Sequence, residues 1–259
     1  MSLLAWIILF SLLGGVLSVL AASVYLLLPD APRQRLLPHL VSFAIGALLG
    51  AAFLALLPHA MMLSHDFHGL GLTILLGILF FFTLEKMVLW HHCHAQDCEA
   101  HGHQESAKVN STPGVLILVG DGLHNMVHGV LIASAFLTDF HLGVVTSLAI
   151  AAHEIPQEVG DFAVLLHSGF SPGRALFLFS VISGLTSIIG ALTAYYSFEG
   201  AQFLLPYVLA VAVSNLIYIA VADLIPGLHK RTHFSATVQQ LSLILLGVAV
   251  IYWANAVLH

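Results

Sequence analysis

Charged residues are scarce in this sequence. Seven Lys and Arg residues and 13 Asp and Glu residues make up 8% of its 259 residues, whereas 59% are hydrophobic. A soluble domain needs more polar surface than this, and a nucleic-acid partner calls for a clustered basic surface. The composition therefore predicts a protein that lies in a lipid bilayer and binds no nucleic acid.

Cysteine is almost absent as well. The two cysteines, Cys93 and Cys98, lie together in one polar segment. This spacing offers no disulfide framework. It also places no thiolate within the apolar parts of the chain, where the sequence has other polar groups.

Long apolar stretches are abundant. A membrane-spanning helix needs about 20 mostly apolar residues, and the chain holds eight stretches of this kind. We therefore expect an all-α fold, a polytopic bundle of eight transmembrane helices that forms a single domain over residues 1–259. The stretches cover residues 2–28, 38–62, 70–90, 114–137, 142–167, 174–197, 206–228 and 236–258.

The basic residues predict the orientation of these helices, because cytoplasmic loops collect Lys and Arg. With eight spans, all seven basic residues fall on one face, and the opposite connections at 63–69, 138–141 and 198–205 contain none. We expect both termini to lie outside the cytoplasm. The seven residues are Arg33, Arg35, Lys86, Lys108, Arg174, Lys230 and Arg231.

One connection, at about 91–113, differs from the others in its length and content. It holds five histidines around the two cysteines, and the charge pattern makes it cytoplasmic. Cys/His-rich tracts favour metal binding by composition, although the spacings do not match a closed zinc module. A flexible metal-binding loop and a merely polar linker both remain open. The histidines are His91, His92, His94, His101 and His103.

Two of the expected helices resemble each other. The segment FLALLPHA at 53–60 is similar to AVADLIPG at 220–227, and the two helices are expected to run in opposite directions. Inverted repeats are common in secondary transporters. The match is short and apolar, so chance similarity is the alternative.

The central observation is a set of polar residues within the helices at 114–137 and 142–167. Spacings of three and four place Asp121, His124 and His128 on one helix face. In the second helix, His153 and Gln157 lie one turn apart beside a stripe of acids. The full set is Asp121, His124, Asn125 and His128, followed by His153, Glu154, Gln157, Glu158 and Asp161.

These polar residues lie at about the same depth, near the middle of the two helices. An ionisable residue at the bilayer centre costs at least about 2.5–3.5 kcal/mol on insertion scales, so a set of this size points to a shared functional site. A hydrogen-bonded polar core that fixes helix packing is the alternative. Pro156 removes a backbone hydrogen bond inside the cluster, and we expect a kink there that frees the carbonyl of Ala152.

Imidazole nitrogens together with carboxylate oxygens suit borderline divalent metals such as zinc, iron or manganese, whereas calcium or magnesium would need more oxygens. The ligating histidines must be neutral, so metal entry is expected to compete with protons. The cluster is therefore predicted to bind a divalent transition metal.

At these residues the chain resembles the ZIP family of divalent metal transporters. The segments DGLHNMVHG at 121–129 and HEIPQEVGDFA at 153–163 are similar to the family's motifs in helices 4 and 5, and closest to the subfamily with a HExPHE signature. Further similarity covers GALLGAAFLALLPHA, FFFTLEK and LIYIAVADLIP, so it spans nearly the whole chain. The resemblance implies one transmembrane transport domain that moves metal toward the cytoplasm, with zinc first and iron, manganese or cadmium as further substrates.

The resemblance also implies a set of metal ligands between helices 4 and 5. Two positions depart from the family pattern: His128 stands where relatives usually have an acid, and Gln157 stands where the signature has its second histidine. Both changes bear on metal preference and on whether two metals bind. The implied ligands are His124, Asn125, His128, His153, Glu154, Gln157 and Glu158.

Two other functions remain open from the sequence. An intramembrane zinc hydrolase or protease would use His153 and Glu154 as the opening of a HExxH motif, but position 157 is Gln and Pro156 disturbs the turn. A metal-sensing membrane protein would bind ions without passing them.

The expected partners are divalent metal ions and the lipid bilayer, with no prosthetic group and no enzymatic activity. The Gly- and Ala-rich segment AIGALLGAA allows close helix packing, either within one subunit or in a homodimer. We expect a multi-pass protein of a bacterial inner (plasma) membrane.

Overall fold

The computed structural model describes residues 2–94, 112–198, 200–229 and 233–258, and these residues form helices without any strand. Two of the short elements, η1 and η3, are π-helices, and η2 is a 3-10 helix. The all-α fold expected from the sequence is confirmed. The elements are α1 (Leu3–Leu26), α2 (Asp30–Gly50), η1 (Ala51–Leu56), α3 (Leu57–Leu63), α4 (Phe67–His94), α5 (Thr112–Thr138), α6 (Phe140–His167), α7 (Pro172–Phe198), η2 (Gln202–Leu204), α8 (Leu205–Tyr218), η3 (Ile219–Leu224), α9 (Ile225–Leu228) and α10 (Phe234–Leu258).

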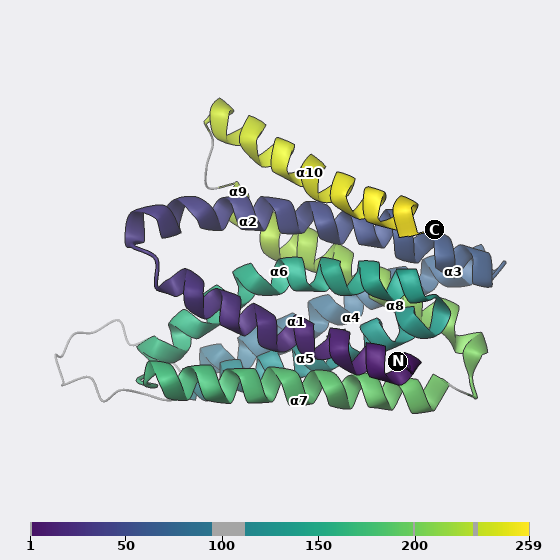
Figure 1. Ribbon diagram of the computed structural model, residues 1–259, viewed down its shortest axis with the longest axis horizontal. Coiled ribbons are helices and arrows are strands. Elements are labelled where there is room, and N and C mark those ends of the chain that lie inside the picture. Colours follow the sequence, from purple (N-terminus) through teal and green to yellow (C-terminus); the bar gives the residue numbers. More distant parts are fainter. Residues whose placement is uncertain (1, 95–111, 199, 230–232, 259) are drawn as a thin grey trace.

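These elements combine into eight long helical rods within the described residues. The segments α2, η1 and α3 form one continuous rod, and η2, α8, η3 and α9 form another. Both termini lie at the same end of the bundle, as an even number of spans requires (Figure 1). Helix α5 packs along α7, and α6 lies between α1 and α2 (Figure 1). The two helices with the polar cluster are therefore covered by other helices.

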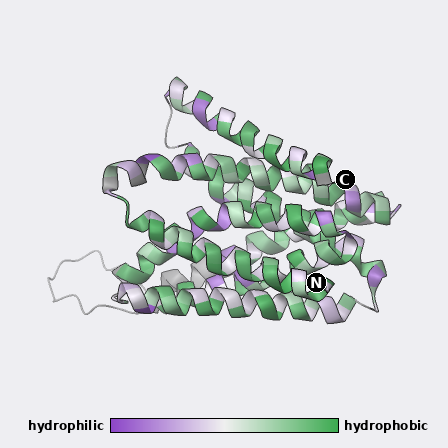
Figure 2. Ribbon diagram, viewed as in Figure 1, coloured by the Kyte–Doolittle hydropathy of each residue, from purple (hydrophilic) through white to green (hydrophobic). Residues whose placement is uncertain are grey.

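Hydrophobic residues predominate along the helices (Figure 2). Large side chains stay exposed on α4 and α10, for example Phe80 at 60%, Leu245 at 58% and Trp253 at 67%. A surface of this kind is unfavourable in water but faces hydrocarbon in a bilayer. Among the described residues, six helices are long and apolar enough to cross a membrane. The protein is thus an integral, multi-pass membrane protein.

The two segments with similar sequences adopt the same irregular structure. Each contains a six-residue π-helix, Ala51–Leu56 in one and Ile219–Leu224 in the other, and each π-helix is followed by a proline two residues later, Pro58 and Pro226. The number of residues that separates the two π-helices in the sequence is the same as the number that separates the two prolines. This agreement supports the inverted repeat over chance similarity.

Proline explains part of this irregularity, because it lacks the N–H that would bond to the carbonyl four residues earlier. For Pro58 that acceptor is the carbonyl oxygen of Leu54. The side-chain amide of Asn255 in α10 donates to it instead, over 3.5 Å. Helix α10 thereby contacts the rod at its π-helix.

Two helix boundaries differ from the sequence expectation. The second rod begins at Asp30 rather than near residue 38, and Pro38 lies inside the helix. Polar residues ahead of the apolar stretch extend the helix beyond the part that hydropathy detects. Likewise, α4 continues to His94, so residues 91–94 of the expected loop are helical. The rest of that loop, at 95–111, lies outside the described residues.

The Gly-rich segment of α2 packs within the chain. A Cβ added to Gly46 would overlap the carbonyl group of Ile244 in α10, and one added to Gly247 would overlap the carbonyl oxygen of Phe43. The small residues are thus required for the close contact between α2 and α10. This contact accounts for the AIGALLGAA pattern without a second subunit.

Candidate metal centre between α5 and α6

The polar cluster is held by the middle of two antiparallel helices. Helix α6 begins at Phe140 because the Asp139 side chain caps it and accepts a hydrogen bond from the N–H of Leu142 at 2.9 Å. From this start, α6 runs through Pro156 to His167 as one helix. Residues near the centre of α6 therefore lie beside the centre of α5.

Three histidines meet at this level: His124 and His128 from α5 and His153 from α6. One ligand atom from each lies within 4.8 Å of the others. The ring centroids are 4.0 Å apart for His124 and His128 and 4.9 Å apart for His128 and His153. Within the described part of the chain, these three are the His, Cys, Asp or Glu residues close enough to hold one metal ion together. We call them the imidazole triad.

Each ring of the triad has a buried nitrogen without a partner. The Nε2 atoms of His124, His128 and His153 form no hydrogen bond with any described group. A buried polar atom left unpaired costs about 1–3 kcal/mol, so three of them side by side need an explanation. A divalent cation that accepts three lone pairs would satisfy all of them at once.

The other ring nitrogen, Nδ1, has a hydrogen-bond partner in two of the three triad histidines. His128 Nδ1 lies 2.8 Å from Oε1 of Glu154, and His153 Nδ1 lies 3.5 Å from the carbonyl oxygen of Ala149. The backbone carbonyl of Ala149 only accepts, so His153 Nδ1 is the donor and its Nε2 keeps the lone pair. The same holds for His128 when the carboxyl group of Glu154 is ionised. This is the usual outer-shell arrangement of histidines that bind metals.

A hydrogen-bond chain lies next to the triad and links α5 to α7. Ser183 Oγ donates to Oδ2 of Asp121 at 2.7 Å, and Asn125 Nδ2 donates to Oδ1 of the same carboxyl group at 2.9 Å. All three residues are buried. The amide nitrogen of Asn125 is thus engaged, and its Oδ1 atom is left without a partner. We call Asp121, Asn125 and Ser183 the amide network.

Ser183 was missed from the sequence. Its helix, α7, looks uniformly apolar, but small residues recur along one buried face at 183, 184, 187, 190, 191 and 194. A stripe of small residues marks a helix that packs closely in a membrane. That pattern is a signal for the packing face, yet nothing in it singles out the hydroxyl that reaches Asp121.

The first helix also borders the site, through two glycines. A Cβ on Gly14 would lie 3.5 Å from Oε2 of Glu154, and a Cβ on Gly15 would lie 3.5 Å from Oδ1 of Asn125. Helix α1 therefore brings its backbone close to these two oxygens, and the side chain of its buried Ser18 also hydrogen-bonds to the carboxyl group of Glu154.

The other predicted ligands lie around the triad rather than in it. Glu158 is buried with its Oε2 atom unpartnered, and it is close enough to interact electrostatically with Asp121, Glu154 and Asp161. Gln157 is half-buried, and its side chain contacts the carboxyl group of Asp161.

Further acids continue from Asp161 toward one end of the bundle. Asp161 interacts electrostatically with Asp223 of η3, which in turn interacts with Glu85 of α4. Glu85 accepts a hydrogen bond from the hydroxyl group of Tyr218. The carboxyl groups of Glu158, Asp161, Asp223 and Glu85 are thus successive electrostatic neighbours, from α6 beside the triad to α4.

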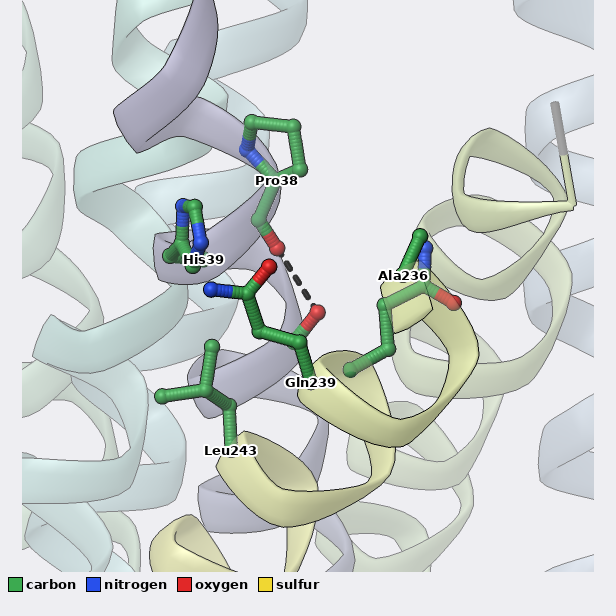
Figure 3. Close-up of a pocket in the computed structure, with 7 residues that line it drawn as sticks. Pro38, His39, Ala236, Gln239 and Leu243 are labelled. Atoms are coloured by element: carbon green, nitrogen blue, oxygen red, sulfur yellow. Dashed lines mark hydrogen bonds between the residues drawn. The ribbon is translucent and has the colours of Figure 1, made fainter. Parts of the chain in front are cut away.

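A separate shallow hollow lies at the surface between α2 and α10 (Figure 3). It includes one histidine, His39, and no acid. It is lined from two helices that do not carry the triad, so it is not the metal centre. The lining residues are Pro38, His39, Ser42, Ala236, Gln239, Gln240 and Leu243.

Comparison with known proteins shows which family the chain is similar to. The family described as ZIP Zinc transporter matches residues 2–115 and 90–254. Zinc transporter ZIP13 of Mus musculus is 32% identical over 260 residues, which cover 87% of this chain and 71% of the relative.

Two other relatives match at similar levels. Zinc transporter ZIP13 of Pongo abelii is 34% identical over 228 residues, covering 83% of this chain and 65% of the relative. The Zinc transporter ZIP13 homolog of Drosophila melanogaster is 28% identical over 276 residues, which cover 85% of this chain and 78% of the relative. The chain thus spans about two thirds to three quarters of the length of these relatives. With the family match extending over nearly all of its residues, the chain belongs to the ZIP zinc transporter family.

Proposed function

We propose that this protein carries divalent transition-metal ions across a membrane toward the cytoplasm, through a site between α5 and α6. Zinc is the first substrate, and iron, manganese or cadmium follow. The relatives named above are zinc transporters by name. The observation that carries the proposal is the imidazole triad, with three unpartnered Nε2 atoms inside a lipid-embedded bundle.

In this proposal the ion is bound by His124, His128 and His153. The predicted oxygen donors Asn125, Glu154, Gln157 and Glu158 surround the imidazoles and offset the charge of the cation. The series of acids from Glu158 to Glu85 supports a path for the ion toward the cytoplasmic side that the basic residues of the sequence predict.

The remaining parts of the proposal rest on the sequence. Residues 1–259 act as one transport domain, the His-rich loop at 91–113 binds metal weakly on the cytoplasmic side, and the homodimer stays a prediction. The protein is proposed to lie in a bacterial inner (plasma) membrane, an expectation to which the eukaryotic relatives add no support. Because those relatives are transporters rather than enzymes, the intramembrane hydrolase is not retained.

Zinc uptake into sealed proteoliposomes tests this function. The wild-type chain should accumulate zinc, and His153→Ala should reduce uptake about 100-fold, because the site loses one of its three imidazole ligands. His68→Ala is the matched control, since His68 is exposed near the start of α4 and outside the triad. Zinc binding without uptake would instead support a metal sensor and contradict the proposal.

A further inference from the structure

The side-chain amide of Asn125 lies within the metal centre. Asn125 is one helical turn after Asp121 and one turn before His128 on α5, and it is 1% exposed. Its Oδ1 atom has no hydrogen-bond partner among the described residues, although most buried side-chain oxygens have one. An amide oxygen carries partial negative charge, and an NH2 group carries partial positive charge. Which of the two faces a cation therefore decides whether Asn125 attracts or repels it.

The surroundings of the NH2 group determine this orientation. Nδ2 of Asn125 donates to Oδ1 of Asp121 at 2.9 Å and to the backbone carbonyl oxygen of the same residue at 3.2 Å. If the amide were flipped, its oxygen would lie against these two oxygens, and its NH2 group would take the place of the unpartnered oxygen. The contacts with Asp121 thus hold Oδ1 of Asn125 on the opposite side.

Ser183 of α7 holds the carboxyl group of Asp121 in turn. Its Oγ atom donates to Oδ2 of Asp121 at 2.7 Å, and Ser183 is fully buried. One carboxyl oxygen is thus bonded to α7 and the other to Asn125, so the carboxyl group cannot rotate without losing both bonds. The orientation of the amide on α5 therefore depends on a second helix.

The unpartnered oxygen of Asn125 lies on the same side of the site as Glu154. A Cβ on Gly15 of α1 would lie 3.5 Å from Oδ1 of Asn125, and a Cβ on the preceding Gly14 would lie 3.5 Å from Oε2 of Glu154. The carboxyl group of Glu154 also has a hydrogen bond with the side chain of Ser18. Two of the predicted oxygen donors, one from α5 and one from α6, thus adjoin the same turn of α1.

We propose that Asp121 and Ser183 are positioning residues, which turn the oxygen of Asn125 toward the transported ion and its NH2 group away. This inference rests on the proposed function and deepens it. Imidazole nitrogens suit zinc, whereas manganese prefers oxygen ligands. The Asn125 oxygen therefore contributes more to the affinity for manganese than to that for zinc. Asp121 and Ser183 thereby determine how well the site accepts the harder ion.

The experiment uses the full-length chain purified in detergent. Manganese(II) binding is measured by electron paramagnetic resonance and zinc binding by isothermal titration. Asp121→Ala should weaken manganese binding about 10-fold, as expected for the loss of an outer-shell partner, and zinc binding by less than about threefold. In the Asn125→Ala background, Asp121→Ala should have no additional effect on either affinity. A further loss in that background would mean that Asp121 does not act through Asn125, and would overturn the proposal.

Two serines of α7 give a matched pair of variants. Ser187 is one turn after Ser183, is also buried, and donates to the backbone carbonyl oxygen of Ser11 in α1 at 3.3 Å. Each substitution by Ala therefore removes one hydrogen bond between helices. Ser183→Ala should lower the affinity for manganese relative to zinc by about threefold, whereas Ser187→Ala should leave that ratio unchanged. An equal ratio in the two variants would mean that the network only holds helices together.

Size-exclusion chromatography checks that each variant is folded, and the serine pair decides the question if Asp121→Ala does not fold. The proposed function fails in a different way, namely if the wild-type chain binds and accumulates zinc no better than His153→Ala. An unchanged metal ratio in Ser183→Ala with intact zinc uptake would overturn the positioning role alone. The two failures are therefore distinguishable.

Discussion

The imidazole triad joins α5 to α6 and the amide network joins α5 to α7, and the histidines of the first and the carboxyl group of the second differ in whether their polar atoms are paired. In the triad, each ring leaves its Nε2 atom without a partner. In the amide network, both oxygens of Asp121 accept hydrogen bonds, from Ser183 and from Asn125. The comparison separates two uses of buried polarity in a membrane protein. The unpaired imidazole nitrogens, and the unpartnered Oδ1 of Asn125 beside them, are available to a ligand, whereas the paired carboxyl group of Asp121 holds α5 to α7.

The largest expected effect is on stability, from Asp121→Ala. The substitution leaves the buried Ser183 Oγ–H without its acceptor and removes the side-chain acceptor of Asn125 Nδ2, which keeps only its 3.2 Å bond to the backbone carbonyl of residue 121. An unpaired buried donor costs about 1–3 kcal/mol. Thermal unfolding in detergent should show a clear loss. Asp121→Asn is the control, because its amide oxygen still accepts one of the two bonds. Equal stability of Asp121→Ala and wild type would mean that the network does not hold α5 to α7.

The opposite pattern is expected for His124→Ala. Zinc affinity should fall about 100-fold, which corresponds to about 2.7 kcal/mol, since one of three nitrogen ligands is lost. The metal-free protein should unfold at the same temperature or a higher one, because the substitution removes an unpaired buried group. Isothermal titration with zinc and thermal unfolding without metal measure the two quantities. If the metal-free His124→Ala protein unfolded at a much lower temperature than wild type, His124 would be a residue that holds the helices together rather than one kept for the metal.

The smallest effects are expected at the glycines of α1 that border both regions. A Cβ at position 15 would lie 3.3 Å from the backbone of Ser183, so Gly15→Ala should push α1 away from α7 and lower stability modestly, by about 1 kcal/mol. Gly120→Ala in α5 is the matched control, because a Cβ there meets nothing within 4 Å. Since Ala is the better helix former, that control should be neutral or stabilising by up to about 1 kcal/mol. Equal responses at the two positions would remove the argument for close approach of α1.

The sequence predicted the architecture well because hydropathy and length determine it directly. All eight expected stretches correspond to helical rods. The errors fall where helical structure is not set by hydropathy, as at Asp30, where polar turns extend α2 beyond its apolar part. The π-helices were also beyond prediction, because Ala51–Leu56 and Ile219–Leu224 look like ordinary apolar helix.

The sequence predicted which histidines come together in the candidate site, but it did not predict the hydrogen bonds around them. Spacing and depth placed His124, His128 and His153 together. No pattern in the sequence distinguishes a carboxylate that faces an ion from one that faces a histidine, so the contact between Glu154 and His128 needed the structure. The same holds for Ser183, whose partner Asp121 is 62 positions away in the chain.

The paired π-helices bear on the history of the molecule. A π-helix arises when an extra residue enters an α-helix, and such a feature is rare and commonly retained at functional sites. Here it occurs at matching places in two antiparallel rods, each ahead of a proline. Two independent insertions at equivalent points are a poor explanation. The simpler one is a single ancestral unit that already carried the irregular turn before it was duplicated and the copies came to lie inverted in the bilayer.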